Sequence, residues 1–252
     1  MSVDWRTIAR EAGRDAAVEY ELHGAEALRR ETLNWMEKHG KGYRPDTLAR
    51  FGIGEAWLTC YRREAKRRRS LWTSRVITIP VGPVTRCYRF EEYNKAQRWR
   101  VVPSGLHPEW IGDLTSSDVL VVEGEWDCMA AFDHGFAHTA THTGGAGTWL
   151  AGWTPMFTNK HVVVCYDRDA VGMRGAARVA RALWPVAASV RIVDLPLPGT
   201  SDAKDLSDFF RLGGTEHGFE HLVRGARRYA GSVYSPGRGP RLSARRTHVL
   251  RA

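Results

Sequence analysis

The sequence contains few cysteines, and none of them has the spacing of a zinc site. Cys60, Cys87, Cys128 and Cys165 form no C-x-x-C or C-x-x-H pair, so no zinc ribbon or zinc finger is expected. No apolar run approaches the ~18 residues of a transmembrane helix, and nothing near the N-terminus resembles a secretory signal. We therefore expect no zinc, no membrane association and a location in a reducing cytoplasm.

Acidic residues are fewer than basic ones. The 252 residues include 37 Lys and Arg but only 28 Asp and Glu, so the net charge is +9. This excess favours a polyanionic partner, most simply nucleic acid, although solvated arginine-rich faces would give the same charge. The most basic run, residues 61–75, is flanked by Tyr61 and Trp72. It is either a solvated loop or helix face, or a nucleic-acid contact that includes Arg67 and Arg68.

The first half of the chain divides into a helical start and a β-rich stretch. Residues 5–39 are rich in Ala, Glu, Arg and Leu and contain no proline, which predicts one or two helices ending near Gly40. Short β-rich runs follow, and they predict a small antiparallel meander with strands at 75–81, 85–90 and 99–102.

The second half has the pattern of an α/β domain. Short apolar runs alternate with helical segments, and they predict strands at 119–123, 137–143, 161–167 and 189–196. Such alternation is typical of a mostly parallel sheet with flanking helices on both faces. The predicted fold class is therefore α/β, or α+β overall. The predicted domains are an N-terminal helical segment at 1–40, a mixed subdomain at 41–115, the α/β domain at 116–228 and a basic, disordered tail at 229–252.

Acidic side chains follow three of the predicted strands. Glu123 ends the first strand, Asp167 and Asp169 end the third, and Asp205 and Asp208 follow the fourth. Because the carboxyl ends of parallel strands meet at one edge of a sheet, these acids should converge. Clustered carboxylates repel one another, and a hard divalent cation such as Mg²⁺ would neutralise them. The sequence therefore predicts a metal site at this edge.

Each acid also has a simpler structural interpretation. Glu123 suits the first turn of a helix, Asp167 with Asp169 suits a turn followed by an N-cap, and Asp205 suits an N-cap. Asp127 lies one helical turn after Glu123 and either supports a site or faces solvent. Helix caps do not readily explain why three clusters each follow a strand, so a site is the favoured interpretation.

The two acidic motifs together resemble a Toprim domain, the metal-binding fold of bacterial primases, topoisomerases and some nucleases. The matching segments are VVEGEWD at 121–127 and DRDAVG at 167–172. THTGGAG at 141–147 resembles a turn of DnaG-type primases, and AKDLSDFF at 203–210 resembles a later Lys-Asp segment of primases. The resemblance implies that two Mg²⁺ or Mn²⁺ ions are held by Glu123, Asp167, Asp169 and Asp205, with Asp127 and Asp208 in support.

The first half is similar to the N-terminal subdomain of the primase polymerase core. The segments concerned are GYRPDTLARFGIG at 42–54 and RVITIPVGPVTRCYRF at 75–90. The resemblance implies contacts to template or nucleotide from Arg86, Arg89 and Lys204, in addition to the basic run. The usual zinc module of such primases has no counterpart here, and GGAGTW lacks the lysine of a P-loop.

The function that this resemblance implies is RNA primer synthesis on single-stranded DNA by two-metal nucleotidyl transfer. The substrates would be ribonucleoside triphosphates, and a separate replicative helicase would be a partner, in a bacterial cytoplasm or in the host cytoplasm of a phage. Two alternatives stay open at this point. One is a Toprim nuclease or phosphotransferase acting on nucleic acid, and the other is a non-catalytic DNA-binding replication accessory protein.

Overall fold

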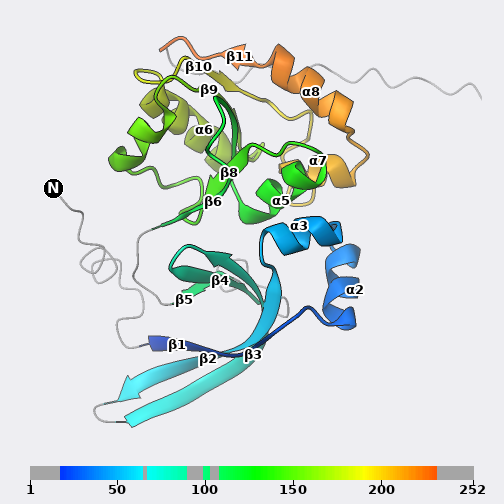
Figure 1. The fold of residues 1–252 in the computed structure, drawn as a ribbon, viewed down its shortest axis with the longest axis vertical. Coiled ribbons are helices and arrows are strands. Elements are labelled where there is room, and N and C mark those ends of the chain that lie inside the picture. Colours follow the sequence, from blue (N-terminus) through cyan, green and yellow to red (C-terminus); the bar gives the residue numbers. More distant parts are fainter. Residues whose placement is uncertain (1–17, 65–66, 90–98, 103–107, 232–252) are drawn as a thin grey trace, which may run out of the picture.

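Two β-sheets form the framework of the protein. The computed structural model describes residues 18–64, 67–89, 99–102 and 108–231. A five-stranded sheet in the order β1-β2-β3-β4-β5 forms the first half, and a six-stranded sheet in the order β11-β10-β9-β7-β8-β6 forms the second (Figure 1). Most of the predicted tail and the first part of the predicted N-terminal helices lie outside the described residues.

The start of the described chain corrects the helix prediction. β1 (Val18–Glu26) is a strand that pairs antiparallel with β2 (Gly54–Glu64), and the predicted helix is confined to α2 (Arg30–Lys38). Residues 18–23 alternate between apolar and polar, and this period of two places Tyr20 and Leu22 against the core of the first sheet. α2 ends at Lys38, close to the predicted stop at Gly40, which has a φ of +68°.

The basic run is a β-hairpin rather than a loop or a helix face. β2 and β3 (Arg67–Val81) pair antiparallel, and we call the end of this hairpin, residues 61–64 and 67–70, the arm. The side chains of Arg67, Arg68 and Arg69, here called the arm arginines, are exposed. β4 (Val84–Tyr88) and β5 (Trp99–Val102) complete the predicted meander.

The second sheet has the predicted mostly parallel arrangement. β8, β7, β9 and β10 run parallel, while β6 pairs antiparallel with β8 at one edge and β11 pairs antiparallel with β10 at the other. The strands are β6 (Trp110–Gly112), β7 (Asp118–Val122), β8 (Thr139–His142), β9 (His161–Cys165), β10 (Ser189–Ile192) and β11 (Arg227–Arg228). The helices are α5 (Glu125–Asp133), η1 (Ala151–Phe157), α6 (Ala170–Leu183), α7 (Leu206–Arg211) and α8 (Glu216–Gly225).

Helices cover both faces of this sheet, as the α/β prediction requires. Val119 and Val121 of β7 point into a core formed with α6 and η1, whereas Leu120 and Val122 point into a core formed with α5, α7 and α8. Among the residues that the structure describes, no helix has the length and apolar character needed to cross a bilayer.

The two halves of the protein share one of these cores. Met36, Ile79 and Tyr88 from the first half lie in the same buried cluster as Trp126 and Met129 of α5. The segment between α2 and α3 (Pro45–Arg50) adds polar contacts across the junction. The Tyr43 hydroxyl donates to the Trp126 carbonyl at 3.0 Å, and the Arg44 amide donates to the Asp133 carboxylate at 2.9 Å. The first half therefore packs directly against α5, the helix that follows Glu123.

Candidate active site

The structure brings Glu123 and Asp167 together at one edge of the second sheet. β7 and β9 are neighbouring parallel strands with Val122 opposite Cys165, so the residues that follow them emerge side by side. The Asp167 amide donates a hydrogen bond to Glu123 Oε2 at 3.2 Å. Burial raises the pKa of Glu123 to about 7, and the neighbouring Asp167 carboxylate adds to the increase. The edge therefore concentrates negative charge that the described residues only partly neutralise.

Lys204 provides the nearest positive charge. Its Nζ lies 2.5 Å from Asp167 Oδ2 and 2.5 Å from Asp169 Oδ2. Although burial opposes the effect, hydrogen bonds to both carboxylates raise the pKa of Lys204. Asp169 is also the N-cap of α6, because its Oδ1 accepts the amides of Val171 and Gly172 at 2.9 Å each. The helix-cap interpretation of Asp169 is therefore confirmed, and its second carboxylate oxygen is left to contact Lys204.

Asp205 and Asp208 form a capping box at the start of α7. Asp205 accepts the Asp208 amide at 2.7 Å, and Asp208 accepts the Asp205 amide at 3.4 Å. Burial raises the pKa of Asp205 to about 6, with the charges of Asp208 and Asp167 contributing. For Asp208, burial is outweighed by hydrogen bonds from Arg211 and the Lys204 amide, so its pKa is lowered. Asp205 therefore has a definite structural role and also lies within the field of the acid cluster.

Asp127 is a buried acid that links α5 to α7. Its Oδ1 accepts the Ser207 amide at 3.0 Å and the Ser207 hydroxyl at 3.1 Å. Burial raises the pKa of Asp127 well above its ordinary value, and the charge of Asp205 acts in the same direction. Asp127 is 6% exposed, so the interpretation as a solvent-facing residue is wrong.

Lys41 is a component of this region that the sequence did not indicate. Its ammonium lies 5.0 Å from the centre of the Trp126 ring, and it is within the electrostatic influence of Asp127 and Asp205. Burial lowers the pKa of Lys41, while these acids oppose the decrease. The lysine follows α2 in the first half, more than eighty residues before Asp127, so no local pattern could connect them.

The small-residue turn after β8 is held by a buried histidine. His142 is 1% exposed, and its Nδ1 accepts the Gly144 amide at 3.2 Å. Its ring is surrounded by tryptophans, with centroid distances of 4.6 Å to Trp153 and 5.1 Å to Trp110. Burial lowers the pKa of His142 to about 4, so the ring is neutral at physiological pH. Ala146 of the same turn approaches Gly175 of α6, where a Cβ would lie 2.8 Å from the Ala146 carbonyl oxygen.

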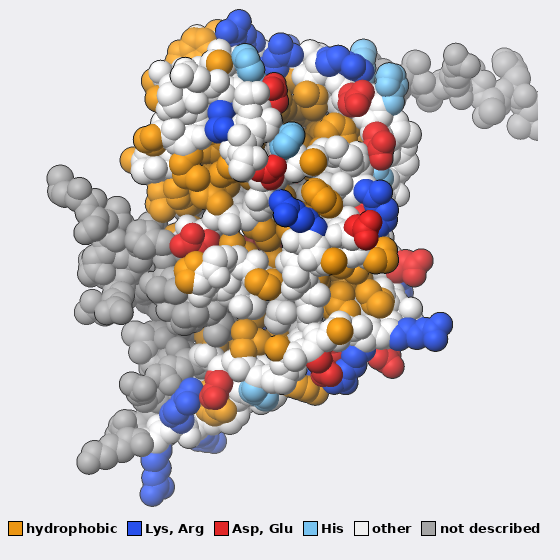
Figure 2. All heavy atoms as spheres, viewed as in Figure 1, with side chains coloured by type: hydrophobic (Ala, Val, Ile, Leu, Met, Phe, Trp, Pro, Cys, Tyr) orange, Lys and Arg blue, Asp and Glu red, His pale blue; other side chains and the backbone are white. Residues whose placement is uncertain are grey.

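The predicted arginines occupy two different settings. Arg86 pairs with the buried carboxylate of Glu125 at 2.6 Å, which ties β4 to the first turn of α5. Arg89 is 8% exposed and lies 3.8 Å from the centre of the Trp72 ring. Arg67 and Arg68, by contrast, lie on the exposed arm, and Figure 2 shows basic side chains at the lower end of the molecule, where Figure 1 places the β2–β3 hairpin. The arm is therefore the more accessible of the two basic regions.

The donor atoms at this edge suit a divalent cation, but they are not arranged as a finished metal site. Within the described ranges, no group of three or more His, Cys, Asp and Glu side chains is placed to hold an ion. Glu123 and Asp167 nevertheless supply hard oxygen donors, and burial together with the Asp167 charge raises the pKa of Glu123. The chemistry of the donors therefore fits Mg²⁺ or Mn²⁺.

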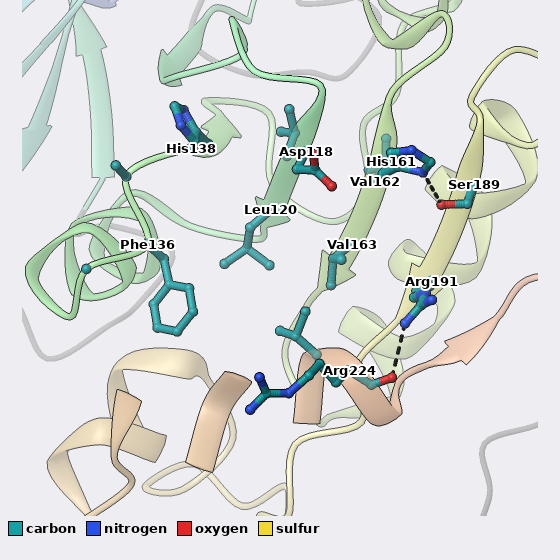
Figure 3. Close-up of a pocket in the computed structure, with 14 residues that line it drawn as sticks. Asp118, Leu120, Phe136, His138, His161, Val162, Val163, Ser189, Arg191 and Arg224 are labelled. Atoms are coloured by element: carbon teal, nitrogen blue, oxygen red, sulfur yellow. Dashed lines mark hydrogen bonds between the residues drawn. The ribbon is translucent and has the colours of Figure 1, made fainter. Parts of the chain in front are cut away.

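A cavity of about 700 Å³ lies at the opposite ends of the same strands (Figure 3). Leu120, Phe136 and Val163 supply apolar surface, and Asp118 and Arg191 are among the polar residues that line it. Because Asp118 is at the start of β7 and Glu123 follows its end, this cavity is separated from the acids by the length of the strand. None of the candidate acids lines this cavity.

The comparisons with known proteins agree with this architecture. Residues 120–210 match the model of a family described as Toprim-like, so this part of the chain is similar to that family. It contains every candidate acid of the site. No curated protein matches the sequence.

Solved structures of primases share the fold of the larger part of the chain. The zinc-binding and RNA polymerase domains of Aquifex aeolicus primase match with a TM-score of 0.62 and 16% identity over 80% of this chain. The Escherichia coli primase catalytic core matches at 0.59 and 18% over 77%, and a DNA primase domain from Pseudomonas aeruginosa at 0.60 and 17% over 80%. The matches span 57%, 72% and 73% of those chains, respectively. At these identities the likeness establishes a primase-core fold, as predicted.

Proposed function

We propose that this protein is a DNA primase core that synthesises RNA primers on single-stranded DNA. The observation that carries the proposal is the convergence of Glu123, Asp167 and Asp169 at one edge of a Toprim-like sheet. The surrounding fold is shared with primase catalytic cores, one of which is described as bound to single-stranded DNA. Ribonucleoside triphosphates are the proposed substrates, and a separate replicative helicase is the proposed partner.

Glu123, Asp167 and Asp169 are the residues that would hold the metal ions in this proposal. Asp205 remains the fourth candidate, although its carboxylate already caps α7. Bound Mg²⁺ or Mn²⁺ would stabilise the attacking 3′ oxygen and the pyrophosphate leaving group. Hydrogen bonds within the chain position the acids. The Asp167 amide orients Glu123, and the Val171 amide at the start of α6 orients Asp169. The Asp127 carboxylate accepts the Ser207 amide and so fixes the start of α7 against α5.

The arm is the proposed contact to the template. The strand register places Arg62 opposite Arg69 and Arg63 opposite Arg68. The exposed arm arginines give this hairpin a positive charge that would attract the phosphates of a template strand. Tyr61, whose ring lies 4.3 Å from the Arg68 guanidinium, adds an aromatic surface for a base. Arg86 and Arg89 remain proposed contacts nearer the acids.

The test is a primer-synthesis assay on single-stranded DNA with labelled ribonucleotides and either Mg²⁺ or Mn²⁺. We expect short RNA products that require the metal and that are lost in Asp167→Asn. The matched control is Asp118→Asn, because this exposed residue begins β7, the strand that Glu123 follows. Both variants should keep the wild-type circular dichroism spectrum and should bind single-stranded DNA.

The products distinguish this function from its alternatives. If Asp167→Asn synthesised primers at the wild-type rate, the assignment of the acids would be wrong. Cutting of the DNA without incorporation of nucleotides would indicate a Toprim nuclease. DNA binding without synthesis or cutting, also in the presence of a replicative helicase, would indicate a non-catalytic accessory protein.

A further inference from the structure

We propose that Lys204 is an internal counter-ion that occupies the acid cluster in the metal-free protein and is displaced when a divalent ion binds. The inference rests on the metal site of the proposed function. It adds a residue that sets the affinity of that site, and it is tested by metal binding rather than by synthesis.

The position of the lysine ammonium is the first argument. Nζ lies 2.5 Å from one carboxylate oxygen of Asp167 and 2.5 Å from one of Asp169. A single cation at hydrogen-bonding distance from two carboxylates of an Asp-x-Asp pair takes the place that a shared metal ion would need. The ammonium and the divalent ion therefore compete for the same two oxygens.

The backbone of Lys204 is held on both sides, whereas its side chain is not enclosed. Its amide donates to Asp208 Oδ2 at 3.0 Å, and its carbonyl accepts the Arg168 amide at 2.7 Å. The Lys204 side chain is 17% exposed, and its ammonium is carried by a flexible four-carbon stem. The ammonium can thus leave the carboxylates toward solvent while the loop that carries it stays in place.

The charge balance favours replacement of the ammonium by a divalent ion. Lys204 contacts the carboxylates of Asp167 and Asp169, and the Glu123 carboxylate accepts the Asp167 amide beside them. Glu123 forms no ion pair with another of the described residues, so the ammonium contacts only two of the three carboxylates. A divalent ion carries twice the charge of the ammonium and binds oxygen ligands from several residues at once. A lysine ammonium has only three donors and therefore neutralises fewer carboxylates.

The competition has a distinctive signature in Lys204→Met, which keeps an unbranched side chain one atom shorter and removes its charge. Measured on the full chain by electron paramagnetic resonance of free Mn²⁺, we expect Mn²⁺ to bind at least tenfold more tightly than to wild type. In EDTA the variant should melt at a lower temperature than wild type, because two carboxylates lose their cation. The gain in melting temperature on addition of Mn²⁺ should be larger than in wild type.

The matched control is Lys160→Met. Lys160 donates to the Ser116 carbonyl at 2.6 Å at the other end of the sheet, so its removal should leave Mn²⁺ affinity unchanged. Equal or weaker Mn²⁺ binding in Lys204→Met would overturn the inference. If neither wild type nor Lys204→Met bound Mn²⁺, the metal site of the proposed function would fail together with the inference. If both bound Mn²⁺ equally well, only the inference would fail.

A second measurement avoids substitution and therefore does not depend on the folding of a variant. Limited acetylation of wild-type protein, followed by mass spectrometry, reports how accessible each lysine amine is. We expect Lys204 to be acetylated several-fold faster in Mn²⁺ than in EDTA, with Lys160 unaffected. An unchanged or reduced rate at Lys204 would show that the ammonium does not leave.

Discussion

Protonation of His142 should make the protein sensitive to mild acid. The ring is 1% exposed, and its pKa is about 4 rather than the ordinary 6.5 because of burial. Below pH 6.5 the unfolded chain takes up a proton at this residue while the folded protein does not, so stability falls as the pH falls. The full contribution is present above pH 6.5 and is lost progressively down to about pH 4.

The size of the effect follows from these two pKa values. The contribution of His142 to the free energy of unfolding should decrease by about 2 kcal/mol between pH 7 and pH 5, and by about 3 kcal/mol at pH 4. Other groups titrate over the same range, so the wild type alone is not informative. The difference between wild type and a variant without the imidazole isolates the contribution.

Two variants provide that difference. His142→Phe keeps the ring volume and loses the acceptor for the Gly144 amide, whereas His142→Asn keeps an acceptor and loses the ring. Urea unfolding followed by tryptophan fluorescence gives the free energies at pH 7 and pH 5. Relative to wild type, both variants should gain about 2 kcal/mol on acidification. His217→Asn, at an exposed position of α8, serves as the control and should gain nothing. If all three variants lost stability in parallel with wild type, the reasoning about His142 would be refuted.

Three further outcomes test other parts of the arrangement. Asp127→Ala should cost about 2–4 kcal/mol in urea unfolding because both Ser207 donors lose a buried acceptor, whereas Asp127→Asn should cost less than half as much. Because burial raises the pKa of Asp127, the Asn variant should also improve relative to wild type as the pH rises above 3.8. Gly172→Ala should lower the melting temperature, since its Cβ would lie 2.3 Å from the Asp167 carbonyl oxygen; Gly147→Ala, with nothing within 4 Å, should not. Replacing the arm arginines by alanine should reduce the slope of log affinity against log salt for single-stranded DNA by about 2, measured by fluorescence anisotropy. An unchanged slope would show that the arm does not contact the DNA.

The second half of the fold was predictable because its signals are local. The two central strands, β7 and β9, are short apolar runs, and each is followed by a turn or a helix start, so the order of these elements can be read along the chain. The positions of Glu123 and Asp167 then follow from the geometry of parallel strands. The same reasoning gave two interpretations of Asp169, and the structure shows why it could not choose, since one carboxylate oxygen caps α6 and the other meets Lys204.

The first half was harder to predict because composition and periodicity disagree there. Residues 18–26 are rich in helix formers, but Tyr20 and Leu22 alternate with charged residues, and pairing with β2 decides in favour of a strand. In the basic run, the many arginines hide the apolar alternation typical of strands, so the long β2–β3 hairpin was not predicted. Long-range partners were beyond any local pattern: Lys41 beside the acids and Glu125 against Arg86 depend on how the two halves pack.

The core that the two halves share also determines which part of this protein could be moved to another scaffold as a folded unit. Trp126 lies against Tyr88, with ring centroids 5.4 Å apart, and both belong to one buried cluster. A fragment cut before β6 would carry every acid of the candidate site, yet it would expose the apolar side of α5 to water. An engineer who grafts the acids onto another scaffold therefore has to bring the first sheet with them or redesign that surface of α5.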